Sequence, residues 1–325
     1  MILVTGCAGF IGMHCAERLL AQGRQVVGID NLNAYYDPAL KDARLARLTA
    51  QPAFRFEKLD VADRAGMADL FARVRPRRVL HLAAQAGVRY SIDAPNTYTD
   101  SNLLGFAHVL EGCRAVQAEH LVYASSSSVY GGNTKTPFSE RDQVDHPVSY
   151  YAATKKANEA MAHSYAHLYA MPCTGLRFFT VYGPWGRPDM ALFKFTRAML
   201  AGEPIDVYGA GQLVRDFTYI DDIATGVLRV LDKPATPGAD SAGAPHRIFN
   251  IGNRTPTLLT DYIGAIEAAL GITANKRMLP IQPGDMHTTW ADTSALQEWA
   301  GFAPATPVRD GVARFVRWYR VFYKV

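Results

Sequence analysis

The feature that most constrains the fold is a glycine-rich turn between a strand and a helix at the start of the sequence. The segment MILVTGCAGFIG predicts a buried strand over Ile2 to Val4, then a turn with Gly6, Gly9 and Gly12, and a helix that ends at Gly23. Glycines at such a turn let the backbone approach a pyrophosphate, which sits at the positive N-terminus of the helix. The spacing is G-x-x-G-x-x-G rather than G-x-G-x-x-G, so the flanking strand and helix carry the prediction. We expect a dinucleotide to bind here.

Strand and helix patterns continue to alternate after this turn. Further strands are predicted over residues 25–30, 54–60, 77–87 and 118–131, with helical patterns between them. This alternation is typical of an α/β protein with a doubly wound parallel sheet. Ligands bind at the carboxyl ends of such strands. The residues expected at those ends are Asp60, Ala83, Ala84, Ser125, Ser126, Ser127 and Ser128.

The second strand ends in an acidic residue that bears on the choice of cofactor. Asp30 lies eighteen residues beyond Gly12, and no arginine follows it until Arg44. A carboxylate at this place accepts hydrogen bonds from an adenosine ribose and repels a 2′-phosphate. The sequence therefore favours NAD over NADP.

The segment SYYAATKK places two tyrosines and two lysines at the start of a predicted helix. Residues four apart share a helix face, so Tyr151 pairs with Lys155, while Tyr150 pairs with Thr154. A nearby ammonium favours the phenolate and lowers the pKa of the tyrosine, which then serves as a general base near neutral pH. The alternative is an ordinary amphipathic helix with a surface lysine. We expect Tyr151 to be the chemical residue.

Composition excludes several classes of function. The 325 residues carry a net charge of +4 from scattered lysines and arginines, which does not indicate a nucleic-acid surface. The four cysteines and nine histidines lack metal-ligand spacing, and the cysteines indicate a reducing cytoplasm. No run of 18 uncharged apolar residues predicts a membrane span, and we expect no signal peptide.

Several motifs in combination resemble the extended short-chain dehydrogenase/reductase family and, within it, the nucleotide-sugar epimerases. They are TGCAGFIG, Asp30, LAAQAGVR, SSSSVYG and YAATK, and the resemblance covers nearly the whole chain. It implies a Rossmann fold, bound NAD and a catalytic set of Ser126, Tyr151 and Lys155, in which the lysine also holds the nicotinamide ribose. The cofactor-binding residues that the resemblance implies are Gly6, Gly9, Phe10, Ile11, Gly12, Asp30, Asn31, Asp60, Val61, Leu82, Ala83, Ala84, Gln85, Asn102, Tyr151 and Lys155.

The same resemblance narrows the range of reactions that we expect. Ser127 and Ser128 stand where sugar-nucleotide 4,6-dehydratases carry an Asp-Glu pair and UDP-glucuronate decarboxylases carry a Glu. The segments RFFTVYGP and GRPDM resemble the UDP-glucuronate 4-epimerases, whereas epimerases of UDP-glucose commonly carry Asn in place of Thr180. The expected reaction is therefore the conversion of UDP-glucuronate to UDP-galacturonate through a transient 4-keto sugar.

The resemblance also implies how the nucleotide sugar is held. In the family, VYG grips the nucleobase and the arginine before DF, here Arg215, binds the diphosphate. A second phosphate-binding arginine of galactose-type epimerases is replaced by Gln282, and Arg89 is a candidate to compensate. The implied substrate-binding residues are Arg89, Ser126, Ser127, Ser128, Tyr151, Thr180, Arg187, Val207, Tyr208, Arg215, Gln282 and Asp285.

Alternative functions remain open at this point. They are 4-epimerisation of UDP-glucose or UDP-N-acetylglucosamine, a decarboxylation that forms UDP-xylose, and a non-catalytic NAD-binding sensor. The resemblance implies an NAD-binding domain over residues 1–179 with about 218–252. A smaller UDP-sugar-binding domain then covers about 180–217 with 253–325. It also implies a homodimer that pairs a helix over about 96–115 with the helix of Tyr151.

Overall fold

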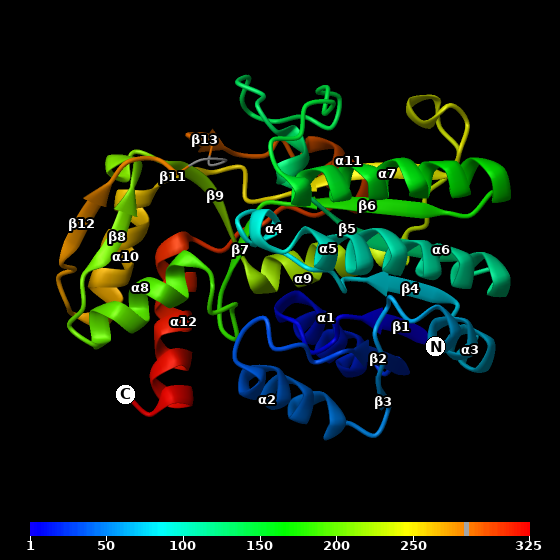
Figure 1. The fold of residues 1–325 in the computed structure, drawn as a ribbon, viewed down its shortest axis with the longest axis horizontal. Helices are drawn as coiled ribbons and strands as arrows, with labels where there is room; N and C mark the ends of the chain where they lie inside the picture. The colour runs from blue at the N-terminus through cyan, green and yellow to red at the C-terminus, as the bar shows by residue number, and fades with distance from the viewer. Residues whose placement is uncertain (283–285) are drawn as a thin grey trace.

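The computed structural model describes residues 1–282 and 286–325 and contains a central sheet of seven parallel strands (Figure 1). The strand order is β10-β6-β5-β4-β1-β2-β3. This arrangement confirms the predicted doubly wound parallel sheet, and the order reverses between β1 and β4, where such sheets bind ligands. The strands are β1 (Ile2–Thr5), β2 (Val26–Asp30), β3 (Phe54–Lys58), β4 (Arg78–His81), β5 (His120–Ser126), β6 (Cys173–Phe178) and β10 (His246–Ile251).

Helices cover both faces of this sheet because successive residues of each buried strand face opposite sides. Val4 lies in one hydrophobic core and Leu3 in the other. The first core contains side chains of α1 (Phe10–Ala21), α2 (Pro38–Thr49) and α9 (Ile220–Asp232). The second contains side chains of α3 (Arg64–Val74), α6 (Gly105–Val116) and α7 (Tyr150–Tyr169).

A smaller lobe of strands and helices lies beside the carboxyl ends of the central strands (Figure 1). One sheet has the order β11-β9-β13, with β7 also paired to β9, and a second sheet pairs β12 with β8. Its strands are β7 (Thr180–Tyr182), β8 (Ile205–Tyr208), β9 (Val214–Tyr219), β11 (Pro256–Leu258), β12 (Lys276–Leu279) and β13 (Thr288–Thr289). Its helices are α8 (Ala191–Leu200), α10 (Leu259–Leu270) and α12 (Val308–Tyr323), while α11 (Ser294–Ala300) packs near β10.

Several element boundaries differ from the sequence-based prediction. The helix expected over about 96–115 is divided into α5 (Pro95–Tyr98), a π-helical turn η1 (Thr99–Leu104) and α6, and a short helix α4 (Tyr90–Asp93) precedes it. The third strand ends at Lys58, before Asp60. Ser125 and Ser126 still belong to β5, and only Ser127 begins the 3-10 helix η2 (Ser127–Tyr130). Within the described part of the chain, no helix is long and apolar enough to cross a membrane.

Candidate active site

The glycine turn forms a backbone cradle that side chains would fill. Gly6 has a φ of +70°, and a Cβ on it would lie 2.7 Å from the backbone nitrogen of Ala83. A Cβ on Gly12 would lie 2.1 Å from the carbonyl oxygen of Gly6. Both positions therefore require glycine, because a side chain on Gly6 would collide with the backbone after β4 and one on Gly12 would collide with the glycine turn itself. The open backbone at a helix N-terminus fits the pyrophosphate of a dinucleotide.

Asp30 closes the other side of this cradle at the end of β2. Its Oδ2 accepts a hydrogen bond from the backbone nitrogen of Ala8 at 3.1 Å, and its Oδ1 accepts one from that of Leu32 at 2.9 Å. A carboxylate has about four acceptor positions, so these bonds orient it and leave lone pairs for ribose hydroxyls. Nearby, the amide of Asn31 donates to Asp60 at 2.8 Å, which brings two more of the expected cofactor residues together.

The remaining expected cofactor residues surround the end of β4 and the π-helical turn. Asn102 accepts from the backbone nitrogen of Gln85 at 2.8 Å and donates to its carbonyl at 3.0 Å. This pair of hydrogen bonds holds the segment after β4 against η1. Such π-helical turns frequently occur at functional sites. Val61 and Phe10 are buried in the two cores, whereas Ile11, Leu82, Ala83 and Ala84 are partly exposed.

The two adjacent tyrosines lie in different surroundings. Ser149 caps α7 and accepts a hydrogen bond from the backbone nitrogen of Ala152 at 3.1 Å, as its residue type predicts. Tyr150 is 41% exposed and shares a hydrogen bond of 2.6 Å with the hydroxyl of Thr99. Tyr151 is half-buried, and its ring lies 6.0 Å from that of Tyr98. The geometry therefore favours Tyr151 as the residue that faces a bound sugar.

The electrostatics of Tyr151 differ from the sequence-based expectation. Burial raises the pKa of Tyr151, while a hydrogen bond with Ser126 and the charge of Arg187 act to lower it. Lys155 is not among these influences, and its ammonium donates to the carbonyl of Ala124 at 2.8 Å. Burial also lowers the pKa of Lys155 to about 8. The expectation that Lys155 lowers the pKa of Tyr151 is therefore wrong for this structure: burial raises that pKa, and the groups that oppose the rise are Ser126 and Arg187.

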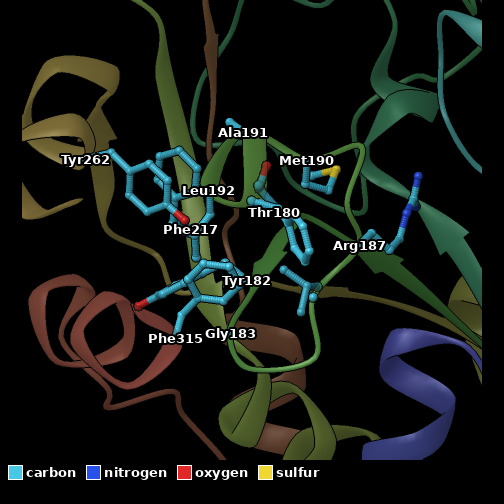
Figure 2. A pocket seen from close by; sticks show the side chains of 13 residues that line it. Thr180, Tyr182, Gly183, Arg187, Met190, Ala191, Leu192, Phe217, Tyr262 and Phe315 are labelled. Carbon is cyan, nitrogen blue, oxygen red and sulfur yellow. The ribbon is translucent and has the colours of Figure 1, made fainter. Parts of the chain in front are cut away.

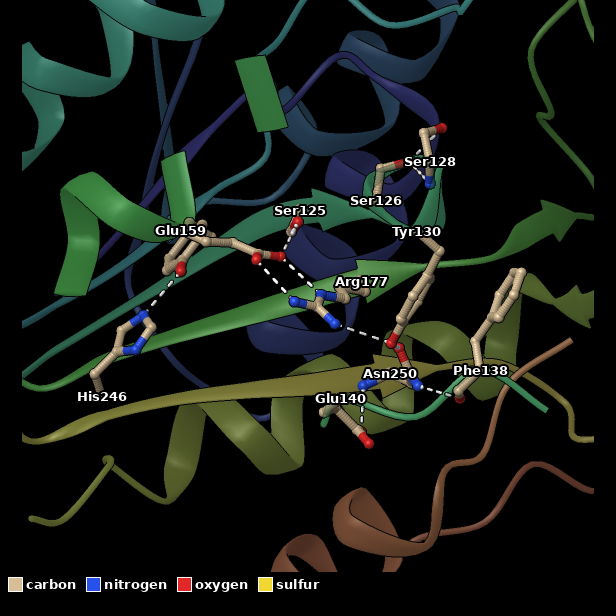
Figure 3. Close-up of polar contacts among 11 residues, drawn as sticks. Ser125, Ser126, Ser128, Tyr130, Phe138, Glu140, Glu159, Arg177, His246 and Asn250 are labelled. Atoms are coloured by element: carbon tan, nitrogen blue, oxygen red, sulfur yellow. Dashed lines mark hydrogen bonds and ion pairs between the residues drawn. The ribbon is translucent and has the colours of Figure 1, made fainter. Parts of the chain in front are cut away.

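The four serines do not all have the same surroundings. The hydroxyl of Ser126 donates to that of Ser128 at 3.1 Å and accepts from the backbone nitrogen of Ser128 at 3.2 Å. Ser125 instead donates to Glu159 at 2.6 Å, in the protein interior. Figure 3 shows Ser126 and Ser128 together at the end of β5. Ser126, Ser127 and Ser128 therefore lie at the edge where the sheet binds ligands, but Ser125 does not.

A buried ionic network holds the serine strand to the tyrosine helix (Figure 3). Glu159 of α7 pairs with Arg177 of β6 through bonds of 2.8 and 2.9 Å, and their side chains are only 6% and 4% exposed. Burial alone would lower the pKa of Arg177, but the bonds and charge of Glu159 raise it above its ordinary value. Arg177 also donates to Tyr130 at 3.0 Å, which donates to Asn250 at 2.6 Å. No local sequence pattern predicts this network, because its members are far apart in the chain.

The segment that follows β7 brings a second charged pair to the site. Arg187 donates through its Nε to Asp189 at 3.0 Å, and Tyr35 donates to the same carboxylate at 3.3 Å. Figure 2 shows the Arg187 side chain directed away from the apolar pocket that Thr180 helps to line. Burial alone would lower the pKa of Arg187, but Asp189 raises it above its ordinary value. Sequence reasoning missed Tyr35 and Asp189, whose roles depend on contacts between distant segments.

The residues expected to bind the nucleotide differ in their contacts and burial. The guanidinium of Arg89 lies over the ring of Tyr208, 5.4 Å from its centroid. Arg215 donates to the carbonyls of Val214 and His287 at 2.9 and 3.2 Å. Val207 is fully buried in the core, whereas its neighbour Tyr208 is partly exposed.

Two further expected residues lie at the edge of the described segment. Gln282 has a buried Oε1 with no hydrogen-bond partner among the described residues. A donor group of a ligand would satisfy such an acceptor. Asp285 lies outside the described residues.

The chain belongs to the NAD dependent epimerase/dehydratase family, whose model matches residues 2–252. It is 51% identical to Protein CapI of Staphylococcus aureus, over 99% of each chain. It is 47% identical to a probable UDP-glucuronate 4-epimerase of Rhizobium meliloti, over 99% of this chain and 97% of the relative. The crystal structure of UDP-glucuronic acid 4-epimerase from Bacillus cereus with UDP-glucuronic acid and NAD superposes with a TM-score of 0.90 at 32% identity, over 99% of each chain.

Proposed function

We propose that this protein is an NAD-dependent epimerase that inverts C4 of UDP-glucuronate and forms UDP-galacturonate. The observation that carries the proposal is the position of Tyr151 at the edge of the sheet where ligands bind. There it hydrogen-bonds Ser126, and the positive charge of Arg187 acts to lower its pKa. The relatives named UDP-glucuronate 4-epimerase support the choice of sugar.

The catalytic residues then have distinct tasks. Tyr151 as phenolate takes the proton of the C4 hydroxyl and later returns it, and Ser126 hydrogen-bonds the reacting oxygen. NAD held at the glycine turn would supply the redox chemistry, as a hydride acceptor for C4 and then a hydride donor to the other face of the sugar. Lys155 holds the nicotinamide ribose, and Ser126 and the charge of Arg187 favour the phenolate of Tyr151. The cofactor is regenerated in each turnover, so we expect it to remain bound.

The 4-keto sugar carries a chemical hazard that the site must control. A 4-keto uronate is a β-keto acid. If its C5–carboxylate bond aligns with the carbonyl π system, the bond breaks, its electron pair enters an enolate, and C5 takes a proton. Carbon dioxide and a 4-keto pentose then form, and the hydride stays on the cofactor. We propose that Ser127, Ser128 and Thr180 hold the carboxylate near the ring plane, together with Arg187.

The nucleotide part of the substrate is assigned to the smaller lobe. We propose that the segment of Val207 and Tyr208 contacts the base, and that Tyr208 makes the direct contact because Val207 is fully buried. Arg215 and Arg89 bind the diphosphate in this proposal. Gln282 and Asp285 complete the substrate loop, and the unpartnered Oε1 of Gln282 supports its contact with a ligand.

We also propose that the chain has two domains with different ligands and that it assembles as a homodimer. Residues 1–179 with about 218–252 bind NAD, and about 180–217 with 253–325 bind the UDP-sugar. The protein acts as a homodimer in the cytoplasm. The four cysteines are free and buried, which suits a reducing compartment.

The direct test is incubation of the purified protein with UDP-glucuronate and NAD, with the products resolved by NMR. Formation of UDP-galacturonate supports the proposal. Conversion of UDP-glucose or UDP-N-acetylglucosamine in preference would replace it with a neutral-sugar epimerase, and a pentose product would indicate a decarboxylase. If no sugar changes and no NADH absorbance develops, the chain is better described as a cofactor-binding sensor.

A further inference from the structure

Arg44 is a fully buried cation whose hydrogen-bond partners among the described residues are backbone carbonyls and one hydroxyl. It belongs to α2 and has 0% exposure. Its Nε donates to the carbonyl of Trp185 at 3.1 Å, and its Nη2 donates to the carbonyls of Trp185 and Gly186 at 2.6 and 3.1 Å. Its Nη1 donates to the carbonyl of Ala8 at 3.1 Å and to the hydroxyl of Tyr36 at 2.6 Å. Burying a guanidinium is unfavourable unless its N–H groups are satisfied, and here five bonds satisfy them.

These bonds connect two parts of the site that are remote in sequence. Ala8 belongs to the glycine turn, and its backbone nitrogen is bound by Asp30, so the peptide groups around it are held from both sides. Trp185 and Gly186 directly precede Arg187. Trp185 has a φ of +64°, a conformation that a bulky residue adopts only when its surroundings impose it. Two hydrogen bonds from Arg44 to the carbonyl of Trp185 are part of those surroundings, together with the packing of its ring against Trp318 and Phe322.

A second, weaker link runs parallel to the first. Tyr35 lies on the loop after Asp30 and donates to Asp189 at 3.3 Å, and Asp189 in turn pairs with Arg187. The charge of Arg187 acts on Tyr151. A continuous set of contacts therefore leads from the cofactor turn, through α2 and its preceding loop, to the residue that we assign to the uronate.

We propose that Arg44 is a positioning residue that joins the cofactor turn to the Trp185–Arg187 segment and thereby sets where Arg187 meets the substrate carboxylate. This inference rests on the proposed function, because it assigns Arg44 a role in uronate recognition through Arg187. A lysine at this position keeps the charge but cannot bind Ala8, Trp185 and Gly186 together, because its single nitrogen lacks the planar fork of a guanidinium.

The test uses Arg44→Lys, Arg187→Ala and the double variant, each purified with its NAD. Binding is measured by calorimetric titration in a Tyr151→Phe background, where turnover is blocked, and the readout is the ratio of affinities for UDP-glucuronate and UDP-glucose. In the active background, the readout is the ratio of carbon dioxide to UDP-galacturonate. Both ratios are independent of the fraction of folded protein, so a purely structural defect does not change them.

We expect Arg44→Lys to lower the preference for UDP-glucuronate at least threefold and to raise the carbon dioxide share. The double variant should match Arg187→Ala alone, because residues that act through one another are not additive. Arg73→Gln, which removes a half-exposed arginine of α3, is the control and should leave both ratios unchanged. Unchanged ratios in Arg44→Lys, or effects that multiply in the double variant, would overturn the proposal.

A second variant covers the case in which Arg44→Lys does not fold. Tyr35→Phe removes only the hydroxyl that binds Asp189 and should shift both ratios in the same direction by a smaller factor, whereas Tyr323→Phe on α12 should not. If Tyr35→Phe changes neither ratio, the proposed connection is wrong.

The wild type distinguishes failure of this inference from failure of the proposed function. A wild type that prefers UDP-glucuronate in binding but forms no epimer refutes the proposed function alone, and the binding ratio then decides the role of Arg44. A wild type without that preference overturns both.

Discussion

At the scale of single residues, Tyr150 and Tyr151 are chemically identical neighbours that the fold treats differently. Tyr151→Phe removes one hydroxyl beside Ser126 and leaves the packing volume unchanged. We expect turnover of UDP-glucuronate to fall by roughly 10³-fold, the size of effect typical for loss of a general base, while NAD remains bound. Tyr150→Phe is the matched control, because it removes a hydroxyl that faces Thr99. Steady-state kinetics and the NAD content of both variants check this. Activity of Tyr151→Phe within tenfold of wild type would move the assignment to Tyr150.

Arg187 is the residue whose loss should change the product as well as the rate. Removing its charge-assisted contact with the carboxylate should cost about 2 kcal/mol of positioning, or roughly thirtyfold in epimerisation. The 4-keto sugar would then sample orientations that release carbon dioxide. We expect Arg187→Ala to give a 4-keto pentose and stranded NADH, and Arg187→Lys to rescue poorly. Carbon dioxide trapping beside an NMR time course measures this. A slower reaction that still yields only the C4 epimer would show that Arg187 serves the diphosphate or the fold instead.

At the scale of elements, the Glu159–Arg177 pair joins α7 to β6 and, through Ser125, to the end of β5. Glu159→Gln leaves the guanidinium of Arg177 buried without its counter-charge, and we expect a loss of about 3 kcal/mol in the free energy of unfolding. Because Ser125 also bonds Glu159, the catalytic rate should fall too. Denaturant unfolding of the NAD-bound protein tests the stability.

Glu119→Gln provides the comparison for this variant. It breaks an ion pair with Arg77 in which both side chains are exposed, 41% and 74%, and such pairs contribute about 0–1 kcal/mol. Equal destabilisation by the two substitutions would show that the buried network contributes no more than a surface pair.

At the scale of the whole molecule, the helices α6 and α7 lie side by side on one face of the central sheet (Figure 1). Leu104, at the end of η1, is 47% exposed and Leu168 of α7 is 67% exposed. A four-helix interface between two copies would cover such side chains. We predict a dimer in solution and a monomer for the Leu104→Lys, Leu168→Lys double variant, measured by light scattering at micromolar concentration.

The control for the dimer is Val321→Lys. Val321 is 76% exposed but lies on α12 in the smaller lobe, so its substitution should leave the dimer intact. A monomeric wild type would refute the predicted interface, and dissociation by Val321→Lys would place the interface on α12.

The sequence by itself determined the parts of this protein that depend on local pattern. Alternating strand and helix segments required a parallel sheet, and the glycines at positions 6 and 12 are needed for close backbone approach that no other residue permits. Ser149 as N-cap fixed the start of α7, and the order of the strands then brought Ser126 and Tyr151 to one edge. The glycine turn and the N-cap could be predicted because each follows from residues a few positions apart, and the parallel sheet follows from the alternation of such segments along the chain.

Only the tertiary structure decided which charges meet. Arg44 lies 141 residues from Trp185, and Tyr35 lies 154 residues from Asp189, so no local pattern reports either contact. The π-helical turn at Thr99–Leu104 depends likewise on the paired contact of Asn102 with the segment after β4. Burial, not the neighbouring lysine, dominates the pKa of Tyr151, because desolvation depends on everything packed around a group. The sequence therefore determined where the site lies, whereas long-range packing decided how its charges are arranged.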